Sequence, residues 1–382
     1  MILRKFEYSE FANKPNSWSL TGLVLEDINL LVGKNATGKT NTIKKINWLG
    51  NMLAGRQPLL LNSGKYDLEF TDGTDIYYYK VYISLQKVDY EELILNDDQK
   101  FQRGNDGRGQ IYTTQFKEEM DFQLPPNQLV VTAKRDAIQH PFLEKLAEWA
   151  DGLRMYAFSS DMGKNTIFLS NDMNSINVDP RDMNSVIGIF IKGEREFPQD
   201  FRKQVIISMG KIGYDLSNIG VTPSNDALLS IPYAGNGKGL ILYIGEKNSN
   251  TPIMQHDMSQ GMFRALSLII QITYNALKKI STTILIDDIG EGLDFERSSS
   301  VIKLITMIAE ERKGQVIMST NDKFVMNNVP LEYWQVIQRT GGECRIYNYH
   351  NSKEKFDEFQ YMGLNNFDFL ATDFINSQWE KA

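Results

Sequence analysis

The octapeptide GKNATGKT, residues 33–40, constrains the fold of this chain more than any other stretch. It follows the apolar segment DINLLVG (27–33), which predicts a buried strand, and it leads into the helical pattern TNTIKKINWLGNML (40–53). It matches G-x-x-x-x-G-K-[ST], the pattern of a phosphate-binding loop between a strand and a helix. The sequence therefore predicts an α/β fold of the P-loop NTPase type.

Each part of this loop has a physical role in binding a nucleotide. Gly33 and Gly38 allow the backbone to wrap closely around phosphate, while the N–H groups of the loop and of the helix start point partial positive charge at the anion. We expect Lys39 to reach the β- and γ-phosphates of ATP and Thr40 to place its hydroxyl on Mg²⁺. The predicted nucleotide-binding residues of this segment are Gly33, Lys34, Asn35, Ala36, Thr37, Gly38, Lys39, Thr40 and Asn41.

A P-loop requires a second element, an acidic residue at the end of a distant apolar strand. The segment TTILIDDIGEGLD, residues 282–294, contains an apolar run that stops at two adjacent aspartates. A carboxylate in this position is costly unless it faces a cation, a hydrogen bond or water. We expect Asp287 to hold the metal ion, and Asp288, on the other side of the strand tip, to orient the attacking water. By itself the pair would only mark where the chain leaves the core.

A third element is MSQGMFRAL, residues 258–266, at the start of an apolar-periodic helix. Ser259 is a favourable N-cap, and Gly261 allows an anion to approach the helix end closely. The alternative is an ordinary capped core helix.

Taken in order, GKNATGKT, MSQGMFRAL, ILIDDIGEGLD and VIMSTND resemble the motifs of ABC-class ATPases, most closely the prokaryotic AAA-type, OLD-like and SMC/RecF-like branch. The resemblance is specific over about residues 1–60 and 235–350. It implies an ABC-type ATPase head with a mixed sheet, an antiparallel β meander and a helical subregion. It also implies a homodimer that sandwiches each ATP, in which Ser259, Gly261 and Arg264 contact the γ-phosphate of the partner's nucleotide and Asp294 is the D-loop aspartate.

The chain departs from this family at two positions. The family usually has glutamate as the general base where Asp288 stands, and the shorter aspartate reaches the water less well. The switch histidine that is expected after the strand QVIMS (315–319) is replaced by Asn321, which can hydrogen-bond a γ-phosphate but cannot take up a proton near neutral pH. Both changes favour slow ATP hydrolysis. No glutamine-loop residue is assigned; Gln86, Gln110 and Gln139 are the candidates.

We predict a single ABC-type ATPase head over residues 1–382. Its expected parts are a lobe with the P-loop and an antiparallel meander (1–135), a helical and irregular insert (136–235), a segment with the signature, the acidic strand and the switch (236–350), and a C-terminal tail (351–382). The last 40 residues are expected to form closing strands and a small helical tail. Further expectations are a meander within 66–95, a loop at 101–110, helices at 136–150, 198–210, 260–279 and 297–311, and strands at 186–191 and 239–245.

Composition excludes several classes of protein. The formal net charge of −7 argues against a surface that binds polyanions everywhere, and Lys44 and Lys45 are expected on a solvated helix face. With one cysteine, Cys344, and three dispersed histidines, we expect neither a disulfide nor a zinc site. No apolar stretch approaches the roughly 20 residues of a membrane span, so a cytoplasmic protein without membrane partners is expected.

The stretch 150–250 is too short and too rich in Pro, Gly and Asn for coiled-coil arms, and little chain remains after residue 350 for a fused nuclease. These features leave an ATPase-only subunit. The resemblance to the ABC-class ATPases implies that such a subunit works with a separate effector, a nuclease or toxin, in an antiphage system. The alternatives are a RecF/SMC-like ATPase of DNA repair or recombination, which binds DNA across its dimer, and the energising subunit of a transporter. A basic groove would favour the first, and a hydrophobic patch for coupling helices the second.

Overall fold

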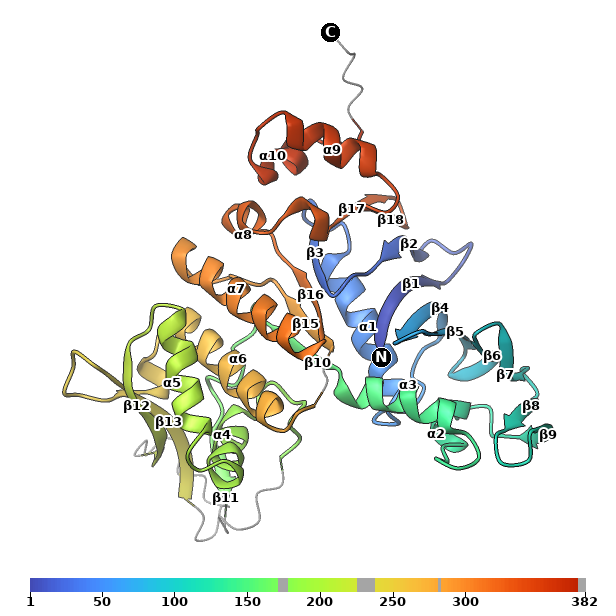
Figure 1. Ribbon diagram of the computed structural model, residues 1–382, viewed down its shortest axis with the longest axis horizontal. Coiled ribbons are helices and arrows are strands. Elements are labelled where there is room, and N and C mark those ends of the chain that lie inside the picture. Colours follow the sequence, from blue (N-terminus) through green and yellow to red (C-terminus); the bar gives the residue numbers. More distant parts are fainter. Residues whose placement is uncertain (171–177, 225–237, 281–282, 377–382) are drawn as a thin grey trace. The chain divides into compact units, whose positions relative to one another are not determined.

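The computed structural model describes four ranges of the chain, and Figure 1 shows their helices and strands. These ranges are residues 1–170, 178–224, 238–280 and 283–376. The predicted insert and tail extend over residues 171–177, 225–235 and 377–382, which lie outside the described residues.

The chain divides into two compact units. Unit 1 contains Met1–Arg154, Ser281–Leu285 and Ala309–Ala382, and unit 2 contains Met155–Ile280 and Ile286–Ile308. The expected single head with four consecutive parts is not decided by this division and stays a prediction.

A mixed sheet of fourteen strands is formed by the described residues, in the order β10-β15-β16-β3-β17-β18-β2-β1-β4-β5-β6-β7-β8-β9. Its strands are β1 (Ile2–Glu10), β2 (Trp18–Val24), β3 (Ile28–Val32), β4 (Ser63–Asp72), β5 (Asp75–Ser84), β6 (Lys87–Leu95), β7 (Asp98–Arg103), β8 (Arg108–Thr113), β9 (Glu118–Gln123), β10 (Arg154–Ala157), β15 (Thr283–Asp287), β16 (Gln315–Ser319), β17 (Trp334–Thr340) and β18 (Glu343–Tyr347). The predicted α/β fold with a mixed sheet is confirmed.

The central strand β3 is buried at all five positions, INLLV, as expected for a strand with neighbours on both sides. It pairs in parallel with β16 on one side and with β17 on the other. Because parallel strands end at the same edge, the segments after β3 and after β16 leave the sheet at one edge. This edge carries the P-loop.

From β4 to β9 the chain forms one antiparallel meander (Figure 1). The predicted meander over 66–95 is confirmed, with Gly73 at a positive φ of 66° in its first turn. The prediction of a loop at 101–110 was wrong, because β7 and β8 form a hairpin there. Its inward positions, Phe101, Arg103 and Ile111, are buried. Because one of them is an arginine, the sequence lacks the alternation of apolar and polar residues that would have indicated a strand.

The helices are α1 (Lys39–Leu53), α2 (Val130–Ala133), α3 (Pro141–Gly152), α4 (Val186–Glu196), α5 (Phe201–Lys211), α6 (Gln260–Leu277), α7 (Phe295–Arg312), α8 (Lys323–Asn328), α9 (Lys353–Tyr361) and α10 (Asn366–Ala371), with 3-10 turns η2 (Gln255–Asp257) and η3 (Leu331–Tyr333). The predicted helices are confirmed, although α3 begins five residues later than expected, at a proline in its first turn. The small C-terminal helices are confirmed as α9 and α10.

Unit 2 has a second sheet in the order β11-β13-β12, with β14 paired to β13. Its strands are β11 (Phe168–Ser170), β12 (Leu216–Pro223), β13 (Lys238–Glu246) and β14 (Ile253–Met254). The prediction of a strand at VIGIFI (186–191) was wrong, because these residues form the first half of α4. They are buried all round, and a short apolar run cannot distinguish a buried helix from a strand.

No helix among the described residues combines the length and the apolar character that crossing a bilayer requires.

A buried ion pair within the meander also binds the start of α2. Arg103 Nε lies 3.1 Å from Glu91 Oε2, and both side chains are fully buried. Glu91 also accepts hydrogen bonds from Val130 N and from the Tyr79 hydroxyl, at 2.9 and 3.0 Å. Burial raises the pKa of Glu91 in spite of the neighbouring guanidinium.

Replacing Arg103 with methionine would leave the Glu91 carboxylate buried without its cation. We expect Arg103→Met to lower the free energy of unfolding in urea by about 3–5 kcal/mol. The double variant Glu91→Gln/Arg103→Met, whose amide still accepts the Val130 and Tyr79 bonds, should recover most of this loss. As a control, Arg135→Met breaks the half-exposed Arg135–Glu144 pair and should cost less than about 1 kcal/mol. If Arg103→Met and Arg135→Met lowered the free energy of unfolding equally, the buried pair would not be the stronger of the two interactions and the prediction would be wrong.

Candidate nucleotide-binding site

The loop from Gly33 to Gly38 joins the end of β3 to the start of α1, so the predicted strand–loop–helix arrangement is confirmed. Two of its residues have a positive φ, Ala36 at 63° and Gly38 at 111°. At Gly33 a Cβ atom would lie 2.6 Å from the carbonyl oxygen of Ile337 on β17, closer than any side chain tolerates. Glycine is therefore required at position 33 by close approach and is favoured at position 38 by the left-handed backbone.

Five carbonyl groups of this loop accept hydrogen bonds from side chains or from the helix backbone. Within the motif, Lys39 Nζ donates to Gly33 O at 2.8 Å and to Lys34 O at 3.1 Å, and Thr37 Oγ1 donates to Lys34 O at 2.9 Å. From β17 and β18, Arg339 Nη1 donates to Ala36 O at 3.2 Å and Cys344 Sγ donates to Thr37 O at 3.1 Å. In α1, Thr42 N donates to Gly38 O at 2.8 Å. A phosphate is repelled by carbonyl oxygens and attracted by N–H groups. A loop whose carbonyls are occupied in this way suits an anion.

The side chains that would meet a nucleotide differ in exposure. Lys39 is 6% exposed, and its ammonium lies over the start of the loop, whereas Lys34, Asn35 and Ala36 are exposed at its crest. Thr40, in the first turn of α1, is half-buried, as is Asn41. The loop can thus present a buried lysine and an accessible crest to one ligand.

Asn321 follows β16 at the same edge of the sheet as the P-loop. The backbone N–H of its neighbour Thr320 donates to Leu31 O on β3 at 3.3 Å. Asp322 caps α8 by accepting bonds from the backbone N–H groups of Phe324 and Val325. Asn321 itself is exposed, between these two fixed neighbours.

In unit 2 the signature residues lie against the GEGLD turn. Ser259 is the N-cap of α6, as predicted, and its hydroxyl accepts a bond from Met262 N at 3.2 Å. At Gly261 a Cβ atom would lie 2.1 Å from the carbonyl oxygen of Gly292, so the helix start and the turn meet backbone to backbone. Arg264 is 7% exposed and donates to Glu291 O at 3.1 Å and to Ser160 O at 2.8 Å.

Asp287 and Asp288 differ in their surroundings although they are adjacent. Asp287 ends β15 with 2% of its surface exposed, and its carbonyl accepts a bond from Phe158 N at 2.9 Å. Asp288 is half-buried with a φ of 53°, a left-handed conformation that aspartate tolerates better than most residues. The turn that it opens is closed by a bond from Glu291 N to Asp288 O at 3.2 Å.

Asp294 precedes the first residue of α7 and accepts a bond from the backbone N–H of Arg297 at 2.9 Å. The Arg297 guanidinium forms an ion pair with the same carboxylate. The backbone N–H of Arg297, followed by its side chain, lowers the pKa of Asp294. This carboxylate is therefore a charged group at a helix N-terminus, and its predicted place in a dimer interface stays a prediction.

The structure groups the predicted site residues into two sets. Residues 33–41 and Asn321 belong to unit 1, while Ser259, Gly261, Arg264, Asp287, Asp288 and Asp294 belong to unit 2. The predicted roles of all these residues in binding and catalysis stay predictions.

Two residues that contact the P-loop were missed by sequence reasoning. Arg339 and Cys344 lie on the C-terminal hairpin β17–β18, far from the loop in sequence, and no motif marks them. The interpretation of Lys45 as a solvated residue was wrong. It is 3% exposed and forms a 2.7 Å ion pair with Glu10, because α1 turns this face toward β1.

The three candidate glutamines lie in unit 1, in the meander and just after it. Gln86 has a positive φ in the β5–β6 turn, Gln110 bonds Asp121 across the β8–β9 hairpin, and the N–H of Gln139 bonds Asp136. His140 bonds Lys134 O through its Nδ1 at 2.8 Å, which is a structural role. In the described ranges, no group of three or more His, Cys, Asp or Glu side chains is arranged as a metal site.

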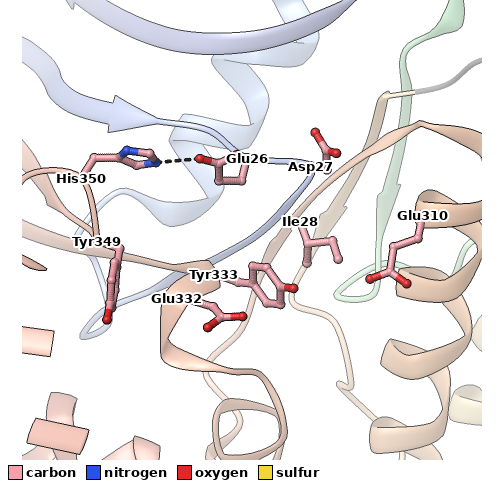
Figure 2. A pocket seen from close by; sticks show the side chains of 8 residues that line it. All are labelled: Glu26, Asp27, Ile28, Glu310, Glu332, Tyr333, Tyr349 and His350. Atoms are coloured by element: carbon pink, nitrogen blue, oxygen red, sulfur yellow. Dashed lines mark hydrogen bonds and ion pairs between the residues drawn. The ribbon is translucent and has the colours of Figure 1, made fainter. Parts of the chain in front are cut away.

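Unit 1 also contains a cavity of about 390 Å³ at the beginning of β3 (Figure 2). Its lining residues are Glu26, Asp27, Ile28, Glu310, Glu332, Tyr333, Tyr349 and His350. His350 bonds Glu26 at 2.8 Å, and burial together with the surrounding carboxylates raises the pKa of Tyr333. The acidic lining would repel a polyphosphate, and the cavity lies at the end of β3 opposite to the P-loop. The P-loop is therefore the candidate nucleotide site.

The first of three similar solved structures supports the fold assignment. The head of Smc, in a crystal structure with the C-winged helix domain of ScpA, is 15% identical with a TM-score of 0.52, over 91% of this chain and 97% of that chain. The SMC head domain from Thermotoga maritima is 13% identical with a TM-score of 0.44, over 91% and 99% of the two chains. The protein cbiO1 from Clostridium perfringens, part of the ABC transporter complex cbiONQ, is 13% identical with a TM-score of 0.39, over 94% of each chain.

No curated protein matches this chain. A family model does, over residues 28–327, and it is described as "AAA domain, putative AbiEii toxin, Type IV TA system". The match runs from β3 to α8 and includes the P-loop, the signature helix and the acidic strand. The chain therefore belongs to the AAA_21 family of P-loop ATPases.

Proposed function

We propose that this protein is a slow ATPase that dimerises around ATP and controls a separate effector protein. The observation that carries the proposal is the P-loop, whose carbonyls at residues 33, 34, 36, 37 and 38 are bound within the chain while Lys39 stays close to the loop. The family match supports the ATPase assignment. Its description names a toxin and a toxin–antitoxin system, and the Smc head of similar fold was crystallised with a domain of another protein, ScpA; both support a partner that is a protein.

Different residues of the chain bind the phosphates and the metal ion in this proposal. Bound Mg²⁺–ATP supplies the reactive phosphoanhydride and a cation that offsets its charge. Lys39 holds the β- and γ-phosphates as a positive charge, and the loop N–H groups hold the same oxygens by hydrogen bonds. The Thr40 hydroxyl and the Asp287 carboxylate fit the preference of Mg²⁺ for oxygen ligands.

Hydrolysis is slow in this proposal because Asp288 is a weak base for the attacking water and Asn321 is a weak substitute for a histidine at the γ-phosphate. Asp288 accepts a proton through a carboxylate one methylene shorter than glutamate, and a misplacement of about 1 Å costs on the order of a hundredfold in rate. Asn321 orients the γ-phosphate by a hydrogen bond and cannot exchange a proton.

Dimerisation completes the site, since Ser259, Gly261 and Arg264 of one protomer face the nucleotide of the other in this proposal. Two observations support this role. The Ser259 hydroxyl accepts a bond from Met262 N, which fixes it at the start of α6, and Gly261 has no side chain that could block a phosphate. In the closed dimer Arg264 exchanges a carbonyl partner for the phosphate. ATP thereby sets the fraction of dimer, and the dimer is the state that the effector, a nuclease or toxin, recognises.

Removal of the P-loop lysine tests nucleotide binding. We expect Lys39→Ala to weaken ATP binding at least a hundredfold, because the charge that faces two phosphates is lost. Titration of the purified protein with a fluorescent ATP analogue measures this. Lys44→Ala, which removes an equal charge from the exposed face of the same helix, is the matched control and should bind within about twofold of the wild type. Tight binding by the Lys39 variant would refute the assignment of this loop.

The role of Asp288 is tested by a neutral isostere. Asp288→Asn should reduce kcat for phosphate release about a hundredfold while the Kd for ATP changes less than about threefold, because asparagine keeps the shape and the left-handed backbone but cannot accept a proton. A wild-type turnover of many ATP per second would contradict slow hydrolysis. An unchanged kcat in the variant would remove Asp288 from the mechanism.

The dimer model is tested at the cap of α6. Ser259→Asp keeps a good N-cap but places a negative charge at the proposed partner phosphate, whereas Ser259→Asn keeps the cap without the charge. In the Asp288→Asn background with ATP, light scattering should show dimers for the wild-type cap and for asparagine, and monomers for aspartate. Dimers in all three proteins would rule out this helix end as the contact.

A further inference from the structure

Two successive carbonyls of the P-loop, those of Ala36 and Thr37, are both bound from the C-terminal hairpin β17–β18. Arg339 on β17 donates to Ala36 O at 3.2 Å, and Cys344 on β18 donates to Thr37 O at 3.1 Å. Arg339 and Cys344 are direct cross-strand partners, so one position of the hairpin ladder binds two successive residues of the loop.

These bonds set the direction of two backbone N–H groups. A trans peptide unit is planar, and its C=O and N–H point in opposite directions. With the carbonyl of Ala36 held toward Arg339, the N–H of Thr37 points away from the hairpin. In the same way the bond from Cys344 turns the N–H of Gly38 away. A peptide that rotated would instead present its carbonyl to an incoming phosphate, which would then be repelled.

We infer that Arg339 and Cys344 are positioning residues that hold the P-loop of this chain in its phosphate-binding conformation. The inference deepens the proposed function and rests on it, because it assumes that ATP binds this loop. The hairpin does not touch the phosphates in this account. It acts on them through the Ala36–Thr37 and Thr37–Gly38 peptides.

The hairpin is built to keep both donors in place. The Nε of Arg339 donates to Gly341 O in the β17–β18 turn at 2.7 Å, which fixes the plane of the guanidinium. Gly341 has a positive φ of 60°, as this tight turn requires. Cys344 is 1% exposed, and burial raises the pKa of its thiol, so the sulfur keeps the proton that it donates. The start of the loop is also confined, because Gly33 lies against Ile337 of β17.

Loss of either donor should loosen the loop without unfolding the chain. We expect Arg339→Ala and Cys344→Ala each to raise the Kd and the KM for ATP about tenfold, with kcat at saturating ATP within about twofold of the wild type. Cys344→Ser keeps a hydroxyl donor and should bind ATP within about twofold of the wild type. Arg339→Lys keeps the charge but lacks the planar fork that reaches Gly341 and Ala36 together, so it should behave like the alanine variant.

Arg345→Ala is the matched control. Arg345 lies on the same hairpin, next to Cys344, and its guanidinium stacks on the Tyr347 ring, so its removal takes away one charge without a bond to the loop. Hydrogen exchange read by mass spectrometry in the absence of nucleotide gives a second readout. Exchange over residues 33–40 should rise in Arg339→Ala and in Cys344→Ala, and should be unchanged in Arg345→Ala.

The outcomes separate this inference from the proposal on which it rests. If the wild type binds no ATP, or if Lys39→Ala binds as tightly as the wild type, the proposed function fails and this inference fails with it. If Lys39→Ala loses binding while Arg339→Ala binds and exchanges as the wild type does, the inference alone is overturned. Full recovery of binding in Arg339→Lys, or equal losses in Arg345→Ala, would show that charge and not position matters. Arg339 is exposed, so its variants decide the question even if the buried Cys344 tolerates no change.

Discussion

A loop that binds phosphate must keep its own carbonyl oxygens away from the ligand, and this constraint organises unit 1. Lys39, Thr37 and the first turn of α1 satisfy the carbonyls that are close to them in sequence. The carbonyls of Ala36 and Thr37 depend on residues 303 and 307 positions away. The C-terminal strands β17 and β18 are therefore part of the proposed nucleotide site, although no nucleotide-binding motif lies in them.

In unit 2 the main constraint is the close approach of two backbone segments, which requires glycine. The start of α6 and the GEGLD turn approach so closely that Gly261 has no room for a side chain, and Arg264 also holds the turn by donating to the carbonyl of Glu291. The segment that is proposed to meet a partner's phosphate is thus fixed to the turn that begins at Asp288. A displacement of the start of α6 would therefore move this turn as well, because their backbones are in contact.

The sequence predicted the features that are encoded locally. The P-loop, the antiparallel meander over β4, β5 and β6, and the cap at Ser259 each depend on residues within one short stretch, and all three are confirmed. The errors concern features that depend on distant contacts. VIGIFI is a helix because other elements bury it on every side. The β7–β8 hairpin contains the inward Arg103 because this residue forms an ion pair with Glu91 on β6. The burial of Lys45 follows from Glu10 on β1, which no pattern in α1 could indicate.

The contact between Gly261 and Gly292 also limits how this protein can change over time. A Cβ atom at Gly261 would strike the carbonyl oxygen of Gly292, which belongs to the backbone and cannot be replaced by a smaller group. Gly292 has a left-handed φ of 83°, which disfavours any other residue there. The two positions are therefore expected to vary neither singly nor as a pair. Adaptation to a new partner would have to occur in the exposed residues around them.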